Sequence, residues 1–237
     1  MRRIRSTLFF IGIFLIASLN WGLAQTTRED FTDGFYIMKW NNSVQRVYVD
    51  LSETGVGCYS VQYLNGQNSV DTTDRISFSH LIDTVCYSKA IFHKHSFDFD
   101  FMTIPLKLRP AQGDVPAQLN THLNGAFYMG YRNDRFALRY QADPLKRSTQ
   151  SINHFGVSVG LFSGVGGTFV SPTTTDFKID KEYDGVVWCN GVAAFIAMNR
   201  FTMGLAFGID YLTDKNRTLW IYQNKPWAAL AFGLNLN

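Results

Sequence analysis

One pair of residue types in this sequence is suited to nucleophilic chemistry. His154 and Ser158 lie four residues apart in the run INHFGVSVGLF, and Ser151 precedes them. A histidine general base that activates a serine is a common arrangement in hydrolases. These residues are therefore candidates for a membrane-embedded lipid hydrolase or acyltransferase. The same residue types also serve as hydrogen-bonded side chains inside a folded protein, and that interpretation is favoured here.

The sequence does not indicate a metal site. His93 and His95 would point to the same side of a strand, as two ligands of one metal do, but no third ligand accompanies them. The chain also lacks a CxxC motif or a cluster of His and Cys residues. We therefore expect no metal and no other cofactor.

A larger group of polar residues alternates with apolar ones. Buried charges persist only when they are paired, so we expect this group to fill the interior of a closed barrel as a network of hydrogen bonds and ion pairs. A polar path for a small solute is the alternative, and it needs more room than about eight strands provide. The group comprises Asp98, Asp100, Lys107, Arg109, Gln118, Asn120, His122, Asn124, Arg139 and Asp210.

Period-two alternation identifies the elements that must position these residues. In FTMGLAFGIDY, and from Leu230 onward in PWAALAFGLNLN, every second residue is bulky and apolar, and the residues between are mostly small. Successive side chains of a strand point to opposite faces. Only 17% of the residues are charged, against about a quarter in an average soluble domain. The small face is too poor in charge to be a hydrated exterior, so we interpret it as a crowded lumen and the bulky face as lipid-facing.

This interpretation predicts the fold class. In hydrocarbon every backbone polar group must be paired, so only helices and closed barrels can span a membrane. Asn199 and Arg200 would split a helical pair into halves too short to cross. We expect an all-β fold, a closed antiparallel up-and-down transmembrane β-barrel of about eight strands. Its first strand or strands come from residues 35–80.

Local signals predict several strand boundaries. A hairpin is expected between FYIMKW and VQRVYVDL, and tight reversals at residues 133–134 and 198–200. The phase of alternation in FDFDFMTIPLKLRP changes near Thr103, which predicts a bulge that keeps six apolar residues on one face. The six are Phe97, Phe99, Phe101, Ile104, Leu106 and Leu108. The run RTLWIYQNKPWAALAFGL is expected to form one long strand or two short ones.

The sequence divides into three parts. Residues 1–24 have the basic start, short apolar run and small residues of a secretory signal peptide. Residues 25–90 form an N-terminal segment, which is either the first strand or strands with a loop or a small soluble or plug-like part; residues 91–237 form the barrel. Without the three arginines of the signal, 22 basic residues become 19 and equal the 19 acidic ones. The mature chain is then formally neutral, and we expect no nucleic-acid partner.

Three cysteines remain in the exported chain. Cys58 and Cys86 could form a disulfide that leaves Cys189 over, or all three could be free thiols. The sequence leaves both arrangements open.

Loop lengths predict an orientation. If the C-terminus lies in the periplasm, the long connection at residues 164–185 falls outside the cell, and the short links at 109–116 and 142–150 fall on the periplasmic side. The outer loop is the expected binding surface, with outer-membrane lipid and an extracellular or periplasmic protein as candidate partners. Its candidate residues are Thr168, Asp176, Lys178, Asp180 and Tyr183. An aromatic girdle toward the outer interface is expected from Tyr131, Trp188, Tyr211 and Trp227.

The strand style is similar to that of a known group of proteins. The runs TIPLKLRP, PAQLNTHLNGAFYMGYRND, INHFGVSVGLFSG, EYDGVVWCNGVAAF and DKNRTLWIYQNKPWAALAFGLNLN resemble small outer-membrane β-barrel proteins of Bacteroidetes over roughly residues 90–237. The resemblance implies a barrel fold in the outer membrane of a Gram-negative bacterium and carries no assigned activity. Function is therefore expected to be structural or loop-mediated binding, with the lipid-modifying enzyme and a narrow channel as alternatives.

Overall fold

The computed structural model of the chain describes residues 31–52, 55–64, 66–79, 89–142, 148–199 and 201–234. The chain separates into two units, Met1–Thr32 and Asp33–Asn237, and the strands of the described residues belong to the second. The signal peptide predicted at residues 1–24 lies outside the described residues. Within those residues no helix is long and apolar enough to cross a bilayer.

The fold is all-β and antiparallel, as the alternation predicts. In the described residues eleven strands form one sheet, where about eight were expected for the chain, and a short 3-10 turn, η2 (Thr173–Thr175), follows β8. The strands are β1 (Gly34–Trp40), β2 (Ser43–Ser52), β3 (Gly55–Leu64), β4 (Gln67–Ser79), β5 (Ala90–Arg109), β6 (Gln118–Asn120), β7 (Asn124–Ala142), β8 (Ser148–Val170), β9 (Tyr183–Met198), β10 (Phe201–Leu212) and β11 (Pro226–Leu234).

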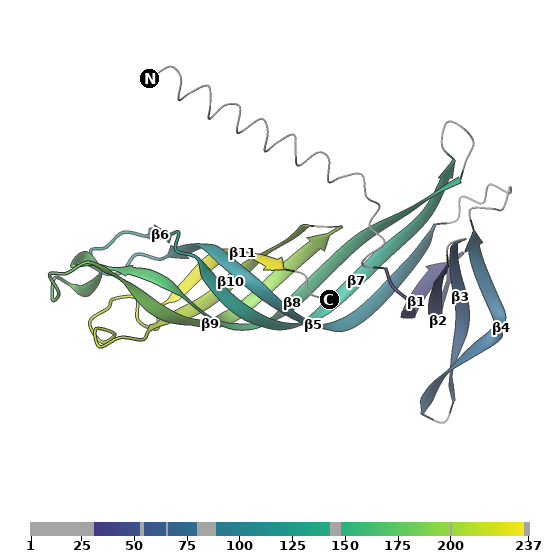
Figure 1. The fold of residues 1–237 in the computed structure, drawn as a ribbon, viewed down its shortest axis with the longest axis horizontal. Helices are drawn as coiled ribbons and strands as arrows, with labels where there is room; N and C mark the ends of the chain where they lie inside the picture. Colours follow the sequence, from purple (N-terminus) through teal and green to yellow (C-terminus); the bar gives the residue numbers. More distant parts are fainter. Residues whose placement is uncertain are drawn as a thin grey trace, which may run out of the picture. The chain divides into compact units, whose positions relative to one another are not determined.

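Six strands pair in a closed cycle. The sheet order runs β11-β10-β9-β8-β7-β5, and β11 also pairs with the second half of β5. We call these six strands the ring. The first half of β5 pairs instead with β1, and β2, β3 and β4 follow in order. We call β1–β4 the lobe, together with the first half of β5, the second half of β7 and the first half of β8, which extend beyond the ring (Figure 1). Residues 35–80 thus supply four strands of the lobe and none of the ring.

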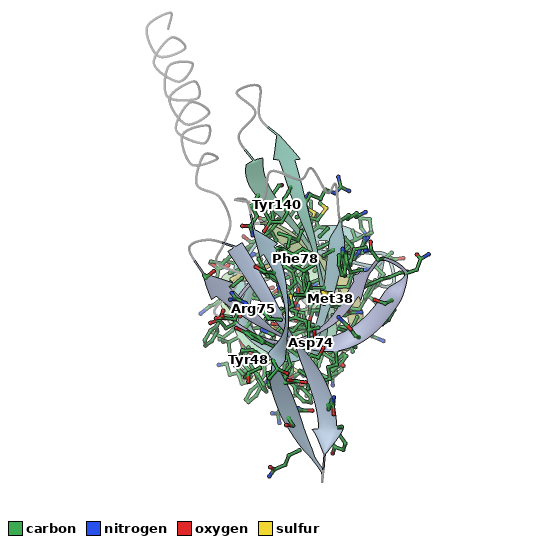
Figure 2. All side chains as sticks on the ribbon, turned by 90° about the vertical axis from the view of Figure 1, so that its right-hand side faces the viewer. Met38, Tyr48, Asp74, Arg75, Phe78 and Tyr140 are labelled. Atoms are coloured by element: carbon green, nitrogen blue, oxygen red, sulfur yellow. The ribbon has the colours of Figure 1, made fainter. Side chains whose placement is uncertain are left out.

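The hairpin predicted at the start of the lobe is confirmed. β1 and β2 pair from Gly34–Val49 to Trp40–Ser43. Asn41 and Asn42 form the two-residue turn with φ of 45° and 62°. Positive φ at both positions is the geometry of the turn that matches strand twist, and Asn tolerates it. At the far edge of the lobe, the Tyr140 hydroxyl of β7 donates to the Phe78 carbonyl oxygen of β4 over 2.6 Å (Figure 2).

Small residues let the ring curl tightly. A row of them crosses five neighbouring strands, and each pairs with the next in register: Gly130, Gly160, Ala193, Ala206 and Ala229. A Cβ at Gly160 would lie 2.2 Å from the carbonyl oxygen of Met129. The row ends against Lys107 of β5, which pairs with Ala229. The small face therefore lines the inside of the ring, as predicted.

The bulge predicted in β5 is present. Leu230 of β11 pairs with Leu106, but Phe232 pairs with Thr103, so β5 holds one extra residue between them. Ile104 lies before the extra residue and stays in phase with Asp98 and Asp100, fully buried. Its predicted place beside the outward phenylalanines is therefore wrong. After the bulge the phase changes, so Lys107 and Arg109 point inward.

Two local predictions fail for physical reasons. Residues 133–134 form no turn, because β7 continues through them and Asp134 turns its carboxylate inward to an ion pair. The run from Arg217 to Pro226 is not a continuous strand: β11 begins at Pro226, and the preceding residues form turns. Trp220 and Tyr222 of those turns pack against Val170, Val187 and Leu212 at one end of the ring.

The ring has a loop end and a lobe end. The connection 110–117 lies at the loop end, since Arg109 and Asn120 both contact Thr168, and the backbone N–H of Ile221 donates to Thr174. The prediction that placed 109–116 opposite the long loop is therefore wrong. That long loop, expected at 164–185, spans only residues 171–182, because β8 continues to Val170. Met198 and Asn199 at the end of β9 lie at the lobe end, opposite the long loop, as do the end of β7 at Ala142 and the start of β8 at Ser148.

Candidate functional site

The outward face of the ring is apolar. Phe99, Phe127, Leu205 and Phe207 are 46%, 47%, 54% and 55% exposed, although each lies in the middle of a strand. Polar side chains on this face bind each other. The Ser163 hydroxyl donates to the Asn190 amide oxygen over 2.8 Å, and the Trp188 indole N–H contacts both at 2.9 and 3.0 Å.

The inside of the ring holds a buried ionic cluster near the loop end, which we call the Asp210 cluster. Asp210 of β10 accepts from the Lys107 ammonium (2.8 Å) and the Arg109 guanidinium (2.6 Å), both from β5. The indole N–H of Trp227, in β11, donates to the same carboxylate over 2.9 Å. Asp210 and Lys107 are wholly buried. Two cations thus share one carboxylate away from water, which is favourable only with such dense pairing.

Aromatic rings cover the two cations. Lys107 lies 4.4 Å from the ring centroid of Trp227, and Arg109 lies 4.9 Å from that of Trp220 and 5.3 Å from that of Tyr222. Such contacts stabilise a desolvated cation through the negative face of the ring. Sequence reasoning missed Trp220 and Tyr222, because they stand in turns where no periodicity marks the inward face. It placed Trp227 in an outer girdle, but this side chain is buried inside the ring.

Neutral polar residues complete the Asp210 cluster. Asn124 accepts from Lys107 over 2.9 Å and donates to the carbonyl oxygen of His122. Thr168, predicted as a loop binding residue, is buried and accepts from Arg109 over 2.8 Å. The Asn120 amide reaches the same hydroxyl at 3.4 Å.

Other predicted residues at the loop end lie outside the interior. His122 is half-exposed and contacts the exposed Asp184 at 3.1 Å. Gln118, in β6, is half-buried. The remaining loop candidates do not form one surface. Asp176 and Lys178 form an exposed pair at 3.5 Å, Asp180 is exposed, and the Tyr183 hydroxyl donates to Asp214 over 2.6 Å.

A second ionic cluster, which we call the Asp134 cluster, lies toward the lobe end. Asp134 contacts His154 Nε2 at 2.6 Å and accepts from Arg132 Nε over 2.9 Å. Arg132 also approaches the buried Asp98 at 3.9 Å. Asp100 is buried on the same face of β5, and a cavity of about 10 Å³ is lined by Asp98, Asp100 and Arg132 among others. That volume is close to the minimum for a single water molecule.

The geometry does not bring the candidate nucleophile and base together. The Ser158 hydroxyl forms a hydrogen bond with the Tyr128 hydroxyl at 2.7 Å, whereas the His154 ring forms one with Asp134. Four residues of strand separate the two by roughly 13 Å. Ser151 is half-buried in β8, three residues before His154 in the same strand. A serine–histidine hydrolase site is not formed by these residues.

One predicted interior residue faces the other way. Arg139 is exposed, because the inner residues of β7 are even-numbered from Asn124 to Leu138. Of the girdle residues, Trp188 and Tyr211 are exposed register partners in β9 and β10. Tyr131 lies elsewhere on the outer face, where His95 stacks on it at 6.0 Å.

The described residues form neither a metal site nor a disulfide. Those residues contain no group of three or more His, Cys, Asp or Glu arranged to hold a metal ion. Cys58 and Cys189 are buried free thiols, and Cys86, the alternative partner of Cys58, lies outside the described residues.

Polarity reverses along single strands. In β7 the outward residues Phe127, Met129 and Tyr131 are apolar or aromatic, and the outward residues Arg135 and Arg139 that follow are charged. On the inner face of β7 the polarity changes in the opposite direction: the charged Asp134 cluster is followed by the buried apolar core of the lobe. That core includes Tyr36, Met38, Val47, Val49, Val56, Phe78, Phe92, Phe136 and Leu138.

Comparison of the chain with family models, with curated proteins and with solved structures gives no match.

Proposed function

We propose that this chain is an outer-membrane β-barrel protein in which the ring spans the bilayer and the lobe lies in water. The observation that carries the proposal is the reversal of polarity along β7. A soluble sheet hides its apolar face and exposes its charges, as the lobe does. The ring does the opposite over its whole circumference, and acyl chains are the medium in which that arrangement is stable.

Backbone pairing supports the same proposal. A spanning sheet must leave no unpaired edge in hydrocarbon, and the pairing of β11 with β5 supplies the last edge of the ring. β9 and β10 contain 16 and 12 residues, against the roughly 9–11 that a spanning strand needs. Six strands enclose a narrower interior than eight, and the inner row of glycine and alanine fits that narrow space.

We further propose that the role is structural or binding rather than catalytic. The interior is filled by the Asp210 and Asp134 clusters, which favours neither a channel nor a substrate pocket. Ser158 and His154 bind other partners, which disfavours the lipid-modifying enzyme. In the proposed orientation the lobe lies in the periplasm. The loops at 171–182 and 213–225 then lie outside the cell and form the surface for recognition.

A matched pair of arginine substitutions tests the proposal. Leu205 on the ring and Val44 on the lobe are both exposed apolar residues, at 54% and 64%. If lipid covers only the ring, Leu205→Arg costs about 2–4 kcal/mol of insertion free energy and Val44→Arg costs almost nothing. The readout is the folded, heat-modifiable band of the membrane fraction on a gel. Equal tolerance of both variants, or a wild-type chain that stays monomeric in detergent-free buffer, contradicts the proposal.

A further inference from the structure

A patch of exposed cations lies on the outward face of the lobe, next to the apolar face of the ring. It consists of Lys39 in β1, Arg46 in β2, Lys89 just before β5, and Arg135 and Arg139 in β7. We call these five residues the basic patch. Arg139, expected in the lumen, belongs to it. The chain as a whole is nearly neutral without its first 24 residues, so this gathering of one sign is a local feature.

Strand register holds the basic patch together. His93 of β5 pairs with Ile37 on one side and with Arg135 on the other, and Ile37 pairs with Arg46. One row further along, Ile91 pairs with Lys39 and with Ala137. The described outward residues of β1, β5, β7 and β8 in the lobe include no carboxylate. The outward acidic residue of β2 is Asp50, four residues beyond Arg46.

A hollow of about 180 Å³ lies within the patch. Its lining includes Lys89, Arg135, Arg139, Asn153 and Phe155. No described carboxylate forms an ion pair with the three cations. The hollow thus combines positive charge that no described carboxylate neutralises with an aromatic rim, Phe155.

The pKa of His93, which lies within the patch, reflects the positive charges around it. Its pKa lies below the usual histidine value, through desolvation first and then through the positive charges of Arg135, His95 and Lys39. A positive field at the surface favours a negatively charged ligand.

The position of the patch selects the ligand. Phe155 follows Asn153 on the outward face of β8, and Val157 and Val159 continue it as apolar residues. On β7 the apolar residue Tyr131 lies four residues from Arg135. Lipid phosphates lie at this border between hydrocarbon and water, and arginine binds phosphate with charge-assisted hydrogen bonds. We propose that the basic patch binds the phosphate of anionic phospholipids in the leaflet on the lobe side; this rests on the proposed membrane location of the ring.

The test uses the full mature chain in lipid nanodiscs. Phosphatidylcholine discs are compared with discs in which about 20 mol% of the lipid is phosphatidylglycerol, which gives the surface a negative charge. Native mass spectrometry measures the ratio of phosphatidylglycerol to phosphatidylcholine that remains bound to the protein. We expect enrichment of phosphatidylglycerol, and the triple variant Lys89→Gln/Arg135→Gln/Arg139→Gln should lower it about fivefold per removed charge. The matched control, Lys178→Gln/Lys181→Gln/Lys215→Gln, removes three exposed cations at the loop end and should leave it unchanged.

A second readout follows His93 by NMR. Its pKa should rise in phosphatidylglycerol discs relative to phosphatidylcholine discs, because a phosphate beside the imidazole favours the charged form. An embedded wild-type chain with no enrichment, or a control variant that loses as much as the triple variant, overturns the inference and leaves the proposed function standing. An equal rise of the His93 pKa with dissolved inorganic phosphate in neutral discs overturns the lipid as ligand. A chain that fails to embed in either disc overturns both proposals.

Discussion

Replacement of Asp210 by asparagine should destabilise the ring strongly. Asp210 is the one carboxylate shared by Lys107 and Arg109, at 2.8 and 2.6 Å, and its side chain is almost wholly buried. The substitution keeps the volume but changes the formal charge of the three residues from +1 to +2. Removal of one partner of a buried ion pair costs about 3–5 kcal/mol, and here two cations lose their counter-charge, so we expect the upper part of that range.

Compensation and a matched control separate charge from shape. Lys107→Met combined with Asp210→Asn returns the charge of the cluster to +1 and should recover a large part of the loss. Asp184→Asn removes an exposed carboxylate that contacts His122 at 3.1 Å and should cost at most about 1 kcal/mol. Urea unfolding of the protein in detergent micelles, followed by heat-modifiable gel mobility, measures all three variants. If Asp210→Asn costs no more than Asp184→Asn, the buried cluster does not stabilise the ring.

Three further outcomes follow from single positions. Gly208→Val places a side chain where a Cβ alone would lie 2.6 Å from the nearest backbone oxygen and 2.7 Å from the Trp227 ring; we expect a loss of about 1–3 kcal/mol in urea unfolding, whereas the outward Ala194→Val is expected to be neutral. The pKa of His93 is lowered in the folded chain, so the imidazole binds a proton more readily in the unfolded chain. The free energy of unfolding should therefore fall as pH drops from the unfolded pKa of His93 through its lower folded pKa. His93→Gln should flatten the plot of unfolding free energy against pH over that interval. Burial raises the pKa of Cys58 to about 12, so in a variant with Cys58 as its sole cysteine, iodoacetamide should fail to label the folded lobe at pH 8 and label it after denaturation.

The outward and inward faces of the ring strands were predictable from their alternation, although a ring of six strands was not. In β10 the bulky residues at 201, 203, 205, 207 and 209 are all exposed, as the sequence pattern indicates. Lys107, Arg109 and Asp210 could also be placed inside, because each is a charge among apolar neighbours in a period-two run. Their mutual contacts could not, since they depend on which strands pair and on the bulge in β5.

Period two alone does not say which face is inside. In β7 the bulky residues change from odd numbers up to Tyr131 to even numbers from Phe136, and the turn signal at residues 133–134 lies between the two runs. The structure shows one unbroken run of pairing along β7, in which the exposed face passes from apolar to charged. The shift of phase marks the passage of β7 from the ring to the lobe, and for this reason Arg139 lies on the outward face and not in the interior as predicted.

Solvent accessibility along β7 tests the central claim most directly. A spin label is placed in turn at outward positions 127, 129, 131, 135 and 139 of the cysteine-free chain in lipid vesicles, and its collisions with oxygen and with a water-soluble nickel chelate are measured. The proposed barrel predicts high oxygen and low nickel accessibility from Phe127 to Tyr131, and the reverse at Arg135 and Arg139. Nickel accessibility as high at Phe127 and Met129 as at Arg139 would contradict a lipid-facing ring.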